Sequence, residues 1–229
     1  MSEYWKNHFN STALKFPDSP LKQVENTVNG HEIDQSQFDL MIEAIVDSLK
    51  ISQVDYVADL CCGNGVVTKV ISKLCRQVDA VDFSVNLIAN ARAEHSAPNI
   101  KYSVSDVASL PDDFFAWPNK GYMCYAVQHL SAADLKVLFG QIFNNRQWGS
   151  FFISGVPDAE RLTAFYDNEE KMAFYRKKEA AGEPHLGKWW ARADLETLVT
   201  ELGLTVRFLP QPAGLFSGHY RFDCLIERT

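Results

Sequence analysis

Short apolar runs alternate with longer amphipathic stretches through the middle of the chain. Apolar runs of strand length lie at residues 56–60, 78–83, 100–104, 122–127 and 150–156, and helical periodicity is present at 65–74, 84–95 and 135–145. A strand, helix, strand order that repeats predicts an α/β fold with a doubly wound, mostly parallel sheet.

The pattern changes after Pro157. A charged and aromatic segment follows, and it predicts a small helical cap inserted at about residues 158–190. Residues 191–204 then read as a helix closed by Gly203, and residues 205–211 and 219–227 read as two strands. We therefore expect the sheet to end in an antiparallel pair.

The N-terminal part contains a convincing helix at residues 32–51, which leads into the first strand of the domain. The stretch before it, with Trp5, Phe9 and Phe16, is too short to form its own core. It either folds over the sheet edge as a lid or simply packs against the domain. We therefore divide the chain into an N-terminal helical or lid segment, 1–50, and a domain, 51–229.

Composition narrows the functional class. The chain has 229 residues and a formal charge of −7, and an acidic protein is a poor candidate for binding nucleic acid by bulk attraction. No signal-peptide pattern and no long apolar run is present, so we expect a cytoplasmic protein that has no membrane partner. Five cysteines without CxxC or Cys/His spacing predict free thiols and no metal site.

The stretch "DLCCGNG", residues 59–65, lies where ligands bind in such a sheet, at the carboxyl end of a strand. Gly65 is not followed by the Lys-Ser/Thr pair of a phosphate-binding loop. A dinucleotide site would need a third glycine at Thr68, and Asp59 would repel a pyrophosphate. An acid at this point instead favours a cationic ligand, and S-adenosylmethionine is such a ligand.

"VADLCCGNG" resembles the motif of the class I S-adenosylmethionine-dependent methyltransferases, in which the first strand ends in an acid followed by a glycine-rich turn. Asp59 matches the acid, and Gly63 and Gly65 match the last two glycines. The resemblance implies a Rossmann-like, seven-stranded sheet with an antiparallel last strand. Cys61 stands where the family usually has glycine. Either this position requires a positive φ, which would strain a cysteine and remodel the loop, or it adopts an ordinary conformation and only small size matters.

The same resemblance implies further cofactor contacts. Asp82 would accept both ribose hydroxyls, Phe83 would flank the adenine, and Asp106 would contact the adenine amino group. The alternatives are that Asp82 is an acid at a helix N-terminus and that Asp106 is a turn residue. S-adenosylhomocysteine would be the product, and the neighbouring cofactor-binding candidates are Cys61, Asn64, Ser84 and Val107.

Two further stretches, 20–30 and 219–223, are similar to a subgroup of bacterial small-molecule methyltransferases, some of them associated with carbohydrate or surface-polysaccharide pathways. Enzymes of this fold that methylate bases often carry an Asn/Asp-Pro-Pro-aromatic motif after the fourth strand. Residues 126–129 read Ala-Val-Gln-His instead, which again disfavours a nucleic-acid substrate.

His129 is the candidate general base, because its ordinary pKa lies near neutrality and it follows a strand at the cofactor end. Alternatively it caps the next helix or packs beside the cofactor. Gln128 would orient an acceptor hydroxyl or contact the cofactor. Further candidates for contact with the acceptor are His185, Trp189, Trp190, His219 and Arg221, which would suit a sugar ring or a flat metabolite.

On an extended strand His219 and Arg221 share one face and Tyr220 takes the other, so we expect only one of these sets to face the site. The interpretation that these patterns favour is an enzyme that methylates an oxygen, or in second place a nitrogen, of a small metabolite such as a sugar. The alternatives are a methyltransferase acting on a protein or another macromolecule, a non-catalytic binding partner of the same fold, and a nicotinamide oxidoreductase.

Overall fold

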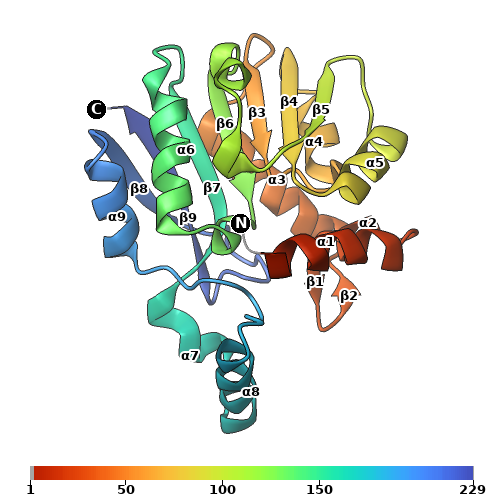
Figure 1. The fold of residues 1–229 in the computed structure, drawn as a ribbon, viewed down its shortest axis with the longest axis vertical. Coiled ribbons are helices and arrows are strands. Elements are labelled where there is room, and N and C mark those ends of the chain that lie inside the picture. Colours follow the sequence, from red (N-terminus) through yellow and green to blue (C-terminus); the bar gives the residue numbers. More distant parts are fainter. Residues whose placement is uncertain (1–2, 229) are drawn as a thin grey trace.

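A seven-stranded sheet forms the centre of the computed structural model, which describes residues 3–228 apart from the side chain of residue 112. The strands have the spatial order β5-β4-β3-β6-β7-β9-β8 (Figure 1). Their bounds are β3 Tyr56–Leu60, β4 Gln77–Asp82, β5 Ile100–Val104, β6 Lys120–Cys124, β7 Ser150–Pro157, β8 Leu204–Pro210 and β9 Arg221–Arg228.

Parallel pairing joins β5, β4, β3, β6 and β7, and β9 runs antiparallel between β7 and β8. This confirms the predicted doubly wound, mostly parallel sheet with an antiparallel last strand. The strand order reverses between β3 and β6, which places the crevice for a ligand at the carboxyl ends of these strands.

Two hydrophobic clusters cover the faces of the sheet. One contains the apolar stripes of α6, Ala132–Asn144, and α9, Arg192–Thr200. The other contains those of α3, Gln35–Leu49, and α4, Val66–Ile71, together with Ile88 of α5, Val85–Glu94. The sheet is thus buried on both faces, which accounts for the continuous apolar runs in its central strands.

Side-chain caps set several helix starts. Asp34 caps α3, Ser84 caps α5, and Ser131 forms a reciprocal capping box with Asp134 at α6. Several elements are shorter than predicted, among them α3 and α9, which were expected at residues 32–51 and 191–204. Helix α4 ends at Ile71 rather than near residue 74, and β6 ends at Cys124, before Tyr125 with its φ of 52°.

Two segments lie at the carboxyl ends of the parallel strands (Figure 1). From the N-terminal part come α1, Glu3–Lys15, α2, Pro20–Gln23, and the small hairpin of β1, Thr27–Val28, and β2, His31–Glu32. Between β7 and α9 lie α7, Leu162–Phe165, and α8, Glu169–Ala180, in the stretch where the sequence predicts a cap.

Asp158 joins the start of this second segment to its end. It is 1% exposed, and its carboxylate pairs with Arg192 at 3.0 Å and with Arg161 at 3.7 Å. An isolated β-bridge also links it to Trp190. In residues 3–228 no helix is long and apolar enough to cross a bilayer.

Candidate functional site

The loop between β3 and α4 turns sharply through three positive φ angles, 61° at Cys61, 56° at Gly63 and 78° at Gly65. A Cβ at Gly65 would come within 2.4 Å of the Tyr102 hydroxyl, so only glycine fits there. Of the two alternatives for Cys61, the structure shows the one with a positive φ. Cysteine carries a conformational cost at this position that glycine would not.

Asp59 is the last residue but one of β3, beneath this loop, and it is buried. The hydroxyls of Thr68 and Tyr122 both donate to its Oδ2, each at 2.6 Å. Burial raises the pKa of Asp59 to about 7, against the lowering effect of the two hydrogen bonds, and the negative charge of Asp82 raises it further. A cation placed beside this carboxyl would stabilise its ionised form.

Asp82 ends β4 and ties two loops together. Its Oδ2 accepts the Gly63 N–H at 3.0 Å and its Oδ1 accepts the Ser84 N–H at 2.8 Å. Burial raises the pKa of this carboxyl to about 6, although both backbone hydrogen bonds lower it. The carboxylate is thereby fixed at the strand end, next to the glycine turn.

Asp106 follows β5 and accepts the Ala108 N–H at 3.1 Å. Lys6 of α1 forms an ion pair with it at 3.3 Å. Burial acts to raise the pKa of Asp106, but the Ala108 hydrogen bond and Lys6 outweigh it, so the pKa lies below the ordinary value. Its carboxylate therefore faces the N-terminal segment.

The remaining cofactor candidates also face that segment or the core. The Asn64 amide donates to the Pro20 carbonyl at 2.8 Å and to Gln23 Oε1 at 3.0 Å. The Ser84 hydroxyl donates to Asn10 Oδ1 at 2.7 Å. Phe83 lies edge-on to the Phe9 ring, with 6.3 Å between centroids, while Val107 is buried in the core.

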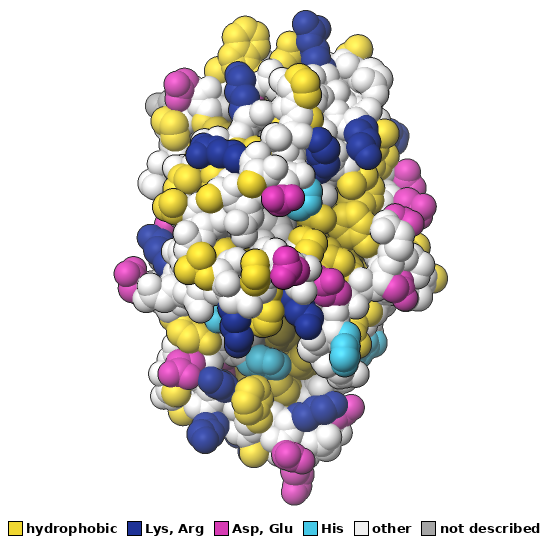
Figure 2. All heavy atoms as spheres, turned by 90° about the vertical axis from the view of Figure 1, so that its right-hand side faces the viewer, with side chains coloured by type: hydrophobic (Ala, Val, Ile, Leu, Met, Phe, Trp, Pro, Cys, Tyr) yellow, Lys and Arg dark blue, Asp and Glu magenta, His cyan; other side chains and the backbone are white. Residues whose placement is uncertain are grey.

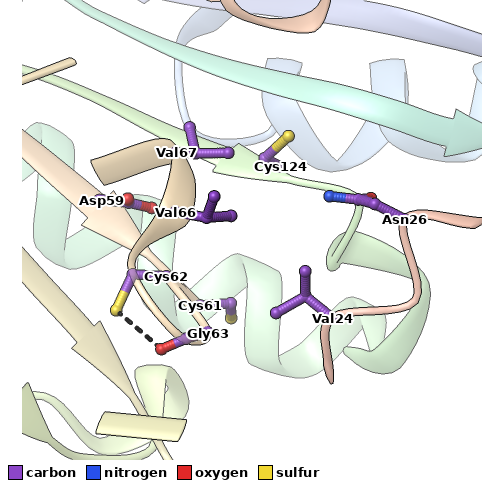
Figure 3. A pocket seen from close by; sticks show the side chains of 9 residues that line it. All are labelled: Val24, Asn26, Asp59, Cys61, Cys62, Gly63, Val66, Val67 and Cys124. Carbon is purple, nitrogen blue, oxygen red and sulfur yellow. Dashed lines mark hydrogen bonds between the residues drawn. The ribbon is translucent and has the colours of Figure 1, made fainter. Parts of the chain in front are cut away.

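A small cavity of about 40 Å³ lies against the turn (Figure 3). Asp59, Cys61 and Gly63 line one side, and Val24 and Asn26 approach from the N-terminal segment. The Val24 side chain covers Gly63 so closely that a Cβ there would lie 2.6 Å from Val24 Cγ1. The segment before α3 therefore packs over the glycine turn.

A second, larger cavity of about 730 Å³ adjoins the first, and Val24 and Asn26 line both. Its walls come from the N-terminal segment, the end of β6, the α7–α8 region and the start of β9. Figure 2 shows histidine side chains around a hollow in the lower part of the molecule. Small-molecule sites typically have this size and this mixture of aromatic and polar walls.

Most of the predicted acceptor contacts meet here, since the cavity is lined by Gln128, His129, His185, His219 and Arg221. Tyr220 lines it as well. The expectation that only one face of 219–221 could reach the site was wrong, because β9 begins at Arg221 and the two residues before it lie in a turn.

The structure does not bring the paired tryptophans to the cavity, which corrects their predicted contact with the acceptor. Trp190 is fully buried in the core, where β7 and α9 meet. The Trp189 ring is tilted against the rings of Phe165 and Tyr220, with 6.0 Å between centroids in each pair, and it does not line the cavity. Both side chains anchor the cap to the domain.

His129 is packed between aromatic rings. The centroid of Trp5 lies 4.1 Å from it and that of Phe9 lies 5.3 Å from it. Burial lowers the pKa of His129 to about 3, and the positive charges of Arg221 and His8 add to the effect. Its Nδ1 has no hydrogen-bond partner among the described residues, and Ser131 rather than His129 caps α6.

Sequence reasoning missed the contribution of the N-terminal segment to both cavities and most of the aromatic wall. Val24 and Asn26 fall within 20–30, a stretch singled out only for its resemblance to a subgroup. The wall includes Phe165, Tyr166 and Phe216, and aromatic residues in the cap were the one available signal.

Comparison with known proteins agrees with this geometry. Residues 57–145 match a family model described as a methyltransferase domain. Among solved structures, magnesium protoporphyrin IX methyltransferase from Synechocystis PCC 6803 with bound S-adenosylhomocysteine gives a TM-score of 0.65 at 13% identity, covering 98% of each chain. The DhpI complex with S-adenosylhomocysteine gives 0.61 at 15%, covering 99% of this chain and 96% of the other.

Residues 57–145 are thus similar to a methyltransferase domain, and the chain has the fold of the S-adenosylmethionine-dependent methyltransferases. A Haloferax volcanii putative methyltransferase, in complex with the Trm112 activator, is also similar, with a TM-score of 0.66, 14% identity and 96% coverage of both chains. The search of curated proteins found no match to this sequence.

The carboxyl end of β3 fits S-adenosylmethionine in charge and backbone shape. Asp59 faces the small cavity, and the Val24 side chain lies in the space that Gly63 leaves open at the turn. At about 40 Å³ that cavity holds little more than water. We expect the N-terminal segment to shift away from the turn when a cofactor binds.

Proposed function

We propose that this methyltransferase methylates an oxygen, and in second place a nitrogen, of a small metabolite held in the 730 Å³ cavity. The observation that carries the proposal is the shared wall. Val24 and Asn26 border both the small cavity at the glycine turn and the large one. A cofactor bound at the turn would thus meet an acceptor in an enclosed space of small-molecule size.

In this proposal the strand-end acids bind the cofactor. Asp59 would attract the cationic methionyl part, and Asp82 would accept hydrogen bonds from the ribose hydroxyls. Asp106 would release its ion pair with Lys6 and accept a hydrogen bond from the adenine amino group. Gly63 and Gly65 let the backbone approach the ligand, since neither has a Cβ.

The cofactor, when bound, supplies a methyl group already activated by its positive sulfur. The chain has to align an acceptor oxygen in line with that group and remove its proton. The hydroxyl proton of the acceptor would pass to a base held by the chain. The walls at α1 and the cap would exclude water from this step.

His129 remains our candidate for that base. Its pKa of about 3 keeps the ring neutral at physiological pH, so it can accept a proton, but its buried cation is unstable beside Arg221. A negative charge near Arg221 would offset that effect. His129 would therefore act as the base with an acceptor that places a negative charge near Arg221.

Transfer of labelled methyl from S-adenosylmethionine to a panel of hydroxylated and aminated metabolites tests the proposal. We expect a product from small acceptors, and we expect His129→Ala to lower turnover about 10²-fold with nearly unchanged cofactor affinity. His31→Ala, at an exposed histidine that lines neither cavity, is the control. Methylation of proteins or RNA but of no small molecule would contradict the proposal.

A further inference from the structure

Arg221 is a buried cation on the wall of the large cavity. It is 4% exposed. Its guanidinium lies over the rings of Tyr125 and Tyr220, with 5.0 and 5.2 Å from Cζ to the centroids. Among the described residues it makes one side-chain hydrogen bond, from Nη1 to the Gly155 carbonyl, and its Nε has no partner.

No carboxylate among the described residues forms an ion pair with Arg221. Burial raises the pKa of Asp223, two residues along β9, to about 6, and the nearby positive charge of Arg221 acts to lower it. The Asp223 carboxylate is not in direct contact with Arg221, since it accepts the Gly155 N–H at 2.7 Å and a Gln211 N–H at 3.0 Å. A guanidinium removed from water without an anionic partner is costly, and two aromatic faces with one carbonyl offset only part of that cost.

The other charges of the cavity are balanced or solvated. Lys171 pairs with Asp167 at 2.8 Å, and Glu25 pairs with His8 at 2.6 Å. Glu170 is exposed at the start of α8. The uncompensated charge inside the wall is therefore the positive charge of Arg221.

We infer that the acceptor is an anionic small molecule whose carboxylate or phosphate-type group binds the Arg221 guanidinium. This rests on the proposed function, since it names the substrate class of the same cavity. A guanidinium presents parallel N–H donors that match two oxygens of such a group.

The surrounding wall indicates the remainder of the molecule. Phe165 and Tyr220 lie in contact with tilted rings and centroids 4.5 Å apart, and Phe216 stacks on Tyr125 at 6.0 Å, so Arg221 lies within an aromatic lining. The Tyr166 hydroxyl and His185 Nδ1 are held 3.1 Å apart by a hydrogen bond on the cap side. A planar or ring-shaped body that carries one acidic group fits this lining.

Matched small probes test the inference without knowledge of the natural acceptor. Benzoate, phenyl phosphate and the neutral benzamide are titrated by calorimetry into the protein loaded with S-adenosylhomocysteine. We expect at least one anion to bind about 10-fold or more tightly than benzamide, because charge-assisted hydrogen bonds contribute that much. The anion that binds more tightly identifies the acidic group of the acceptor as a carboxylate or a phosphate.

Arg221→Met should remove the preference for the anion and leave the affinity for S-adenosylhomocysteine unchanged within about 3-fold. Lys171→Met is the matched control, a cavity cation that already has a partner, and it should keep the preference. If Arg221→Met does not fold, the comparison of anion and amide in the natural chain decides, and Arg221→Lys should retain part of the preference.

Equal binding of benzamide and both anions would overturn the inference while leaving the proposed function intact. A folded Arg221→Met protein that loses affinity for S-adenosylhomocysteine by about 10-fold would overturn it too, because Arg221 would then hold the carboxylate of the cofactor. Failure of the natural chain to bind S-adenosylhomocysteine would instead overturn the proposed cofactor site.

Discussion

Asp82 serves the fold and the proposed cofactor site at the same time. Its two oxygens accept N–H groups from the glycine turn and from the cap of α5, so the carboxylate is held at the strand end before any ligand arrives. The sequence allowed either a ribose contact or a helix-end acid. The observed bonds show that the side chain organises both loops, whichever ligand it meets.

We predict that Asp82→Ala weakens S-adenosylhomocysteine binding about 10-fold or more, since a charge-assisted hydrogen bond to a ribose is worth about 1.5–3 kcal/mol. Calorimetry measures the affinity, at a temperature where circular dichroism shows the variant folded. Asp79→Ala, on the same strand but away from its carboxyl end, is the control. Unchanged affinity in Asp82→Ala would remove this residue from the ribose role.

Because Asp59 is buried, its ionisation makes the free energy of unfolding depend on pH. Its pKa in the fold is about 7 against 3.8 in an exposed carboxyl, so unfolding releases a proton between these values. The free energy of unfolding therefore falls as pH rises through this window. We predict that the natural chain loses about 1–3 kcal/mol relative to Asp59→Asn between pH 4 and pH 8.

Urea denaturation of both proteins across that range measures the difference. Asn cannot ionise but keeps an oxygen for the hydroxyls of Thr68 and Tyr122, so most contacts are preserved. A difference that runs the other way, with the natural chain gaining stability as pH rises, would show that Asp59 is ionised well below neutrality in the fold.

At the scale of elements, the regular part of the fold was predictable. The residues predicted for β3 and β5 are the observed ones, and those of α5 and β7 are right within a residue or two at each end. These elements carry a local signal, because both faces of the central sheet are buried and Ser84 caps its helix. The site was predictable as far as its strand-end acids, whose position follows from the sheet topology.

The irregular elements were not predictable in the same way. The β1–β2 hairpin has two residues a strand and no apolar alternation. The docking of α1 depends on pairs more than 60 residues apart, such as Ser84 with Asn10 and Lys6 with Asp106. The position of Trp190 depends on its β-bridge to Asp158. No local pattern encodes such contacts.

Helix α1 packs against the strand-end loops that carry the proposed cofactor residues. Trp5 is 4% exposed and fixes the helix against His129, while residues 20–26 cover the glycine turn. We predict that Trp5→Ala raises the association rate of S-adenosylhomocysteine about 10-fold, because truncating a buried tryptophan removes about 3–5 kcal/mol of packing.

Surface plasmon resonance on immobilised protein measures this rate. Leu14→Ala is the control, since this side chain lies on the same helix and is 71% exposed. An equal rate for the natural chain and Trp5→Ala would mean that the docking of α1 does not limit entry.

At the scale of the whole molecule, the buried charge in the large cavity is opposite in sign to the net charge of the chain. The chain carries a formal charge of −7, yet its large cavity buries the unpaired guanidinium of Arg221. Composition therefore describes the outer surface and argues against polyanion binding, but it cannot reveal an isolated cation in a wall assembled from distant segments.

The cofactor site is also assembled from distant segments, since it joins the strand-end loops of the domain to α1 and to Val24. A ligand that binds this edge only in the folded state should stabilise the protein as one unit. At 100 times its Kd, S-adenosylhomocysteine should add about 2.7 kcal/mol. For a chain of this size that corresponds to a rise in Tm of about 5–10 °C.

Scanning calorimetry with S-adenosylhomocysteine and with NAD in parallel measures the shift. We expect one transition that moves with S-adenosylhomocysteine and stays in place with NAD, because Asp59 at the turn opposes a pyrophosphate. A separate transition that does not respond to the ligand would mean that the cap between β7 and α9 unfolds independently. In that case the 730 Å³ cavity would open without loss of the cofactor site, since the residues at the glycine turn lie outside the cap.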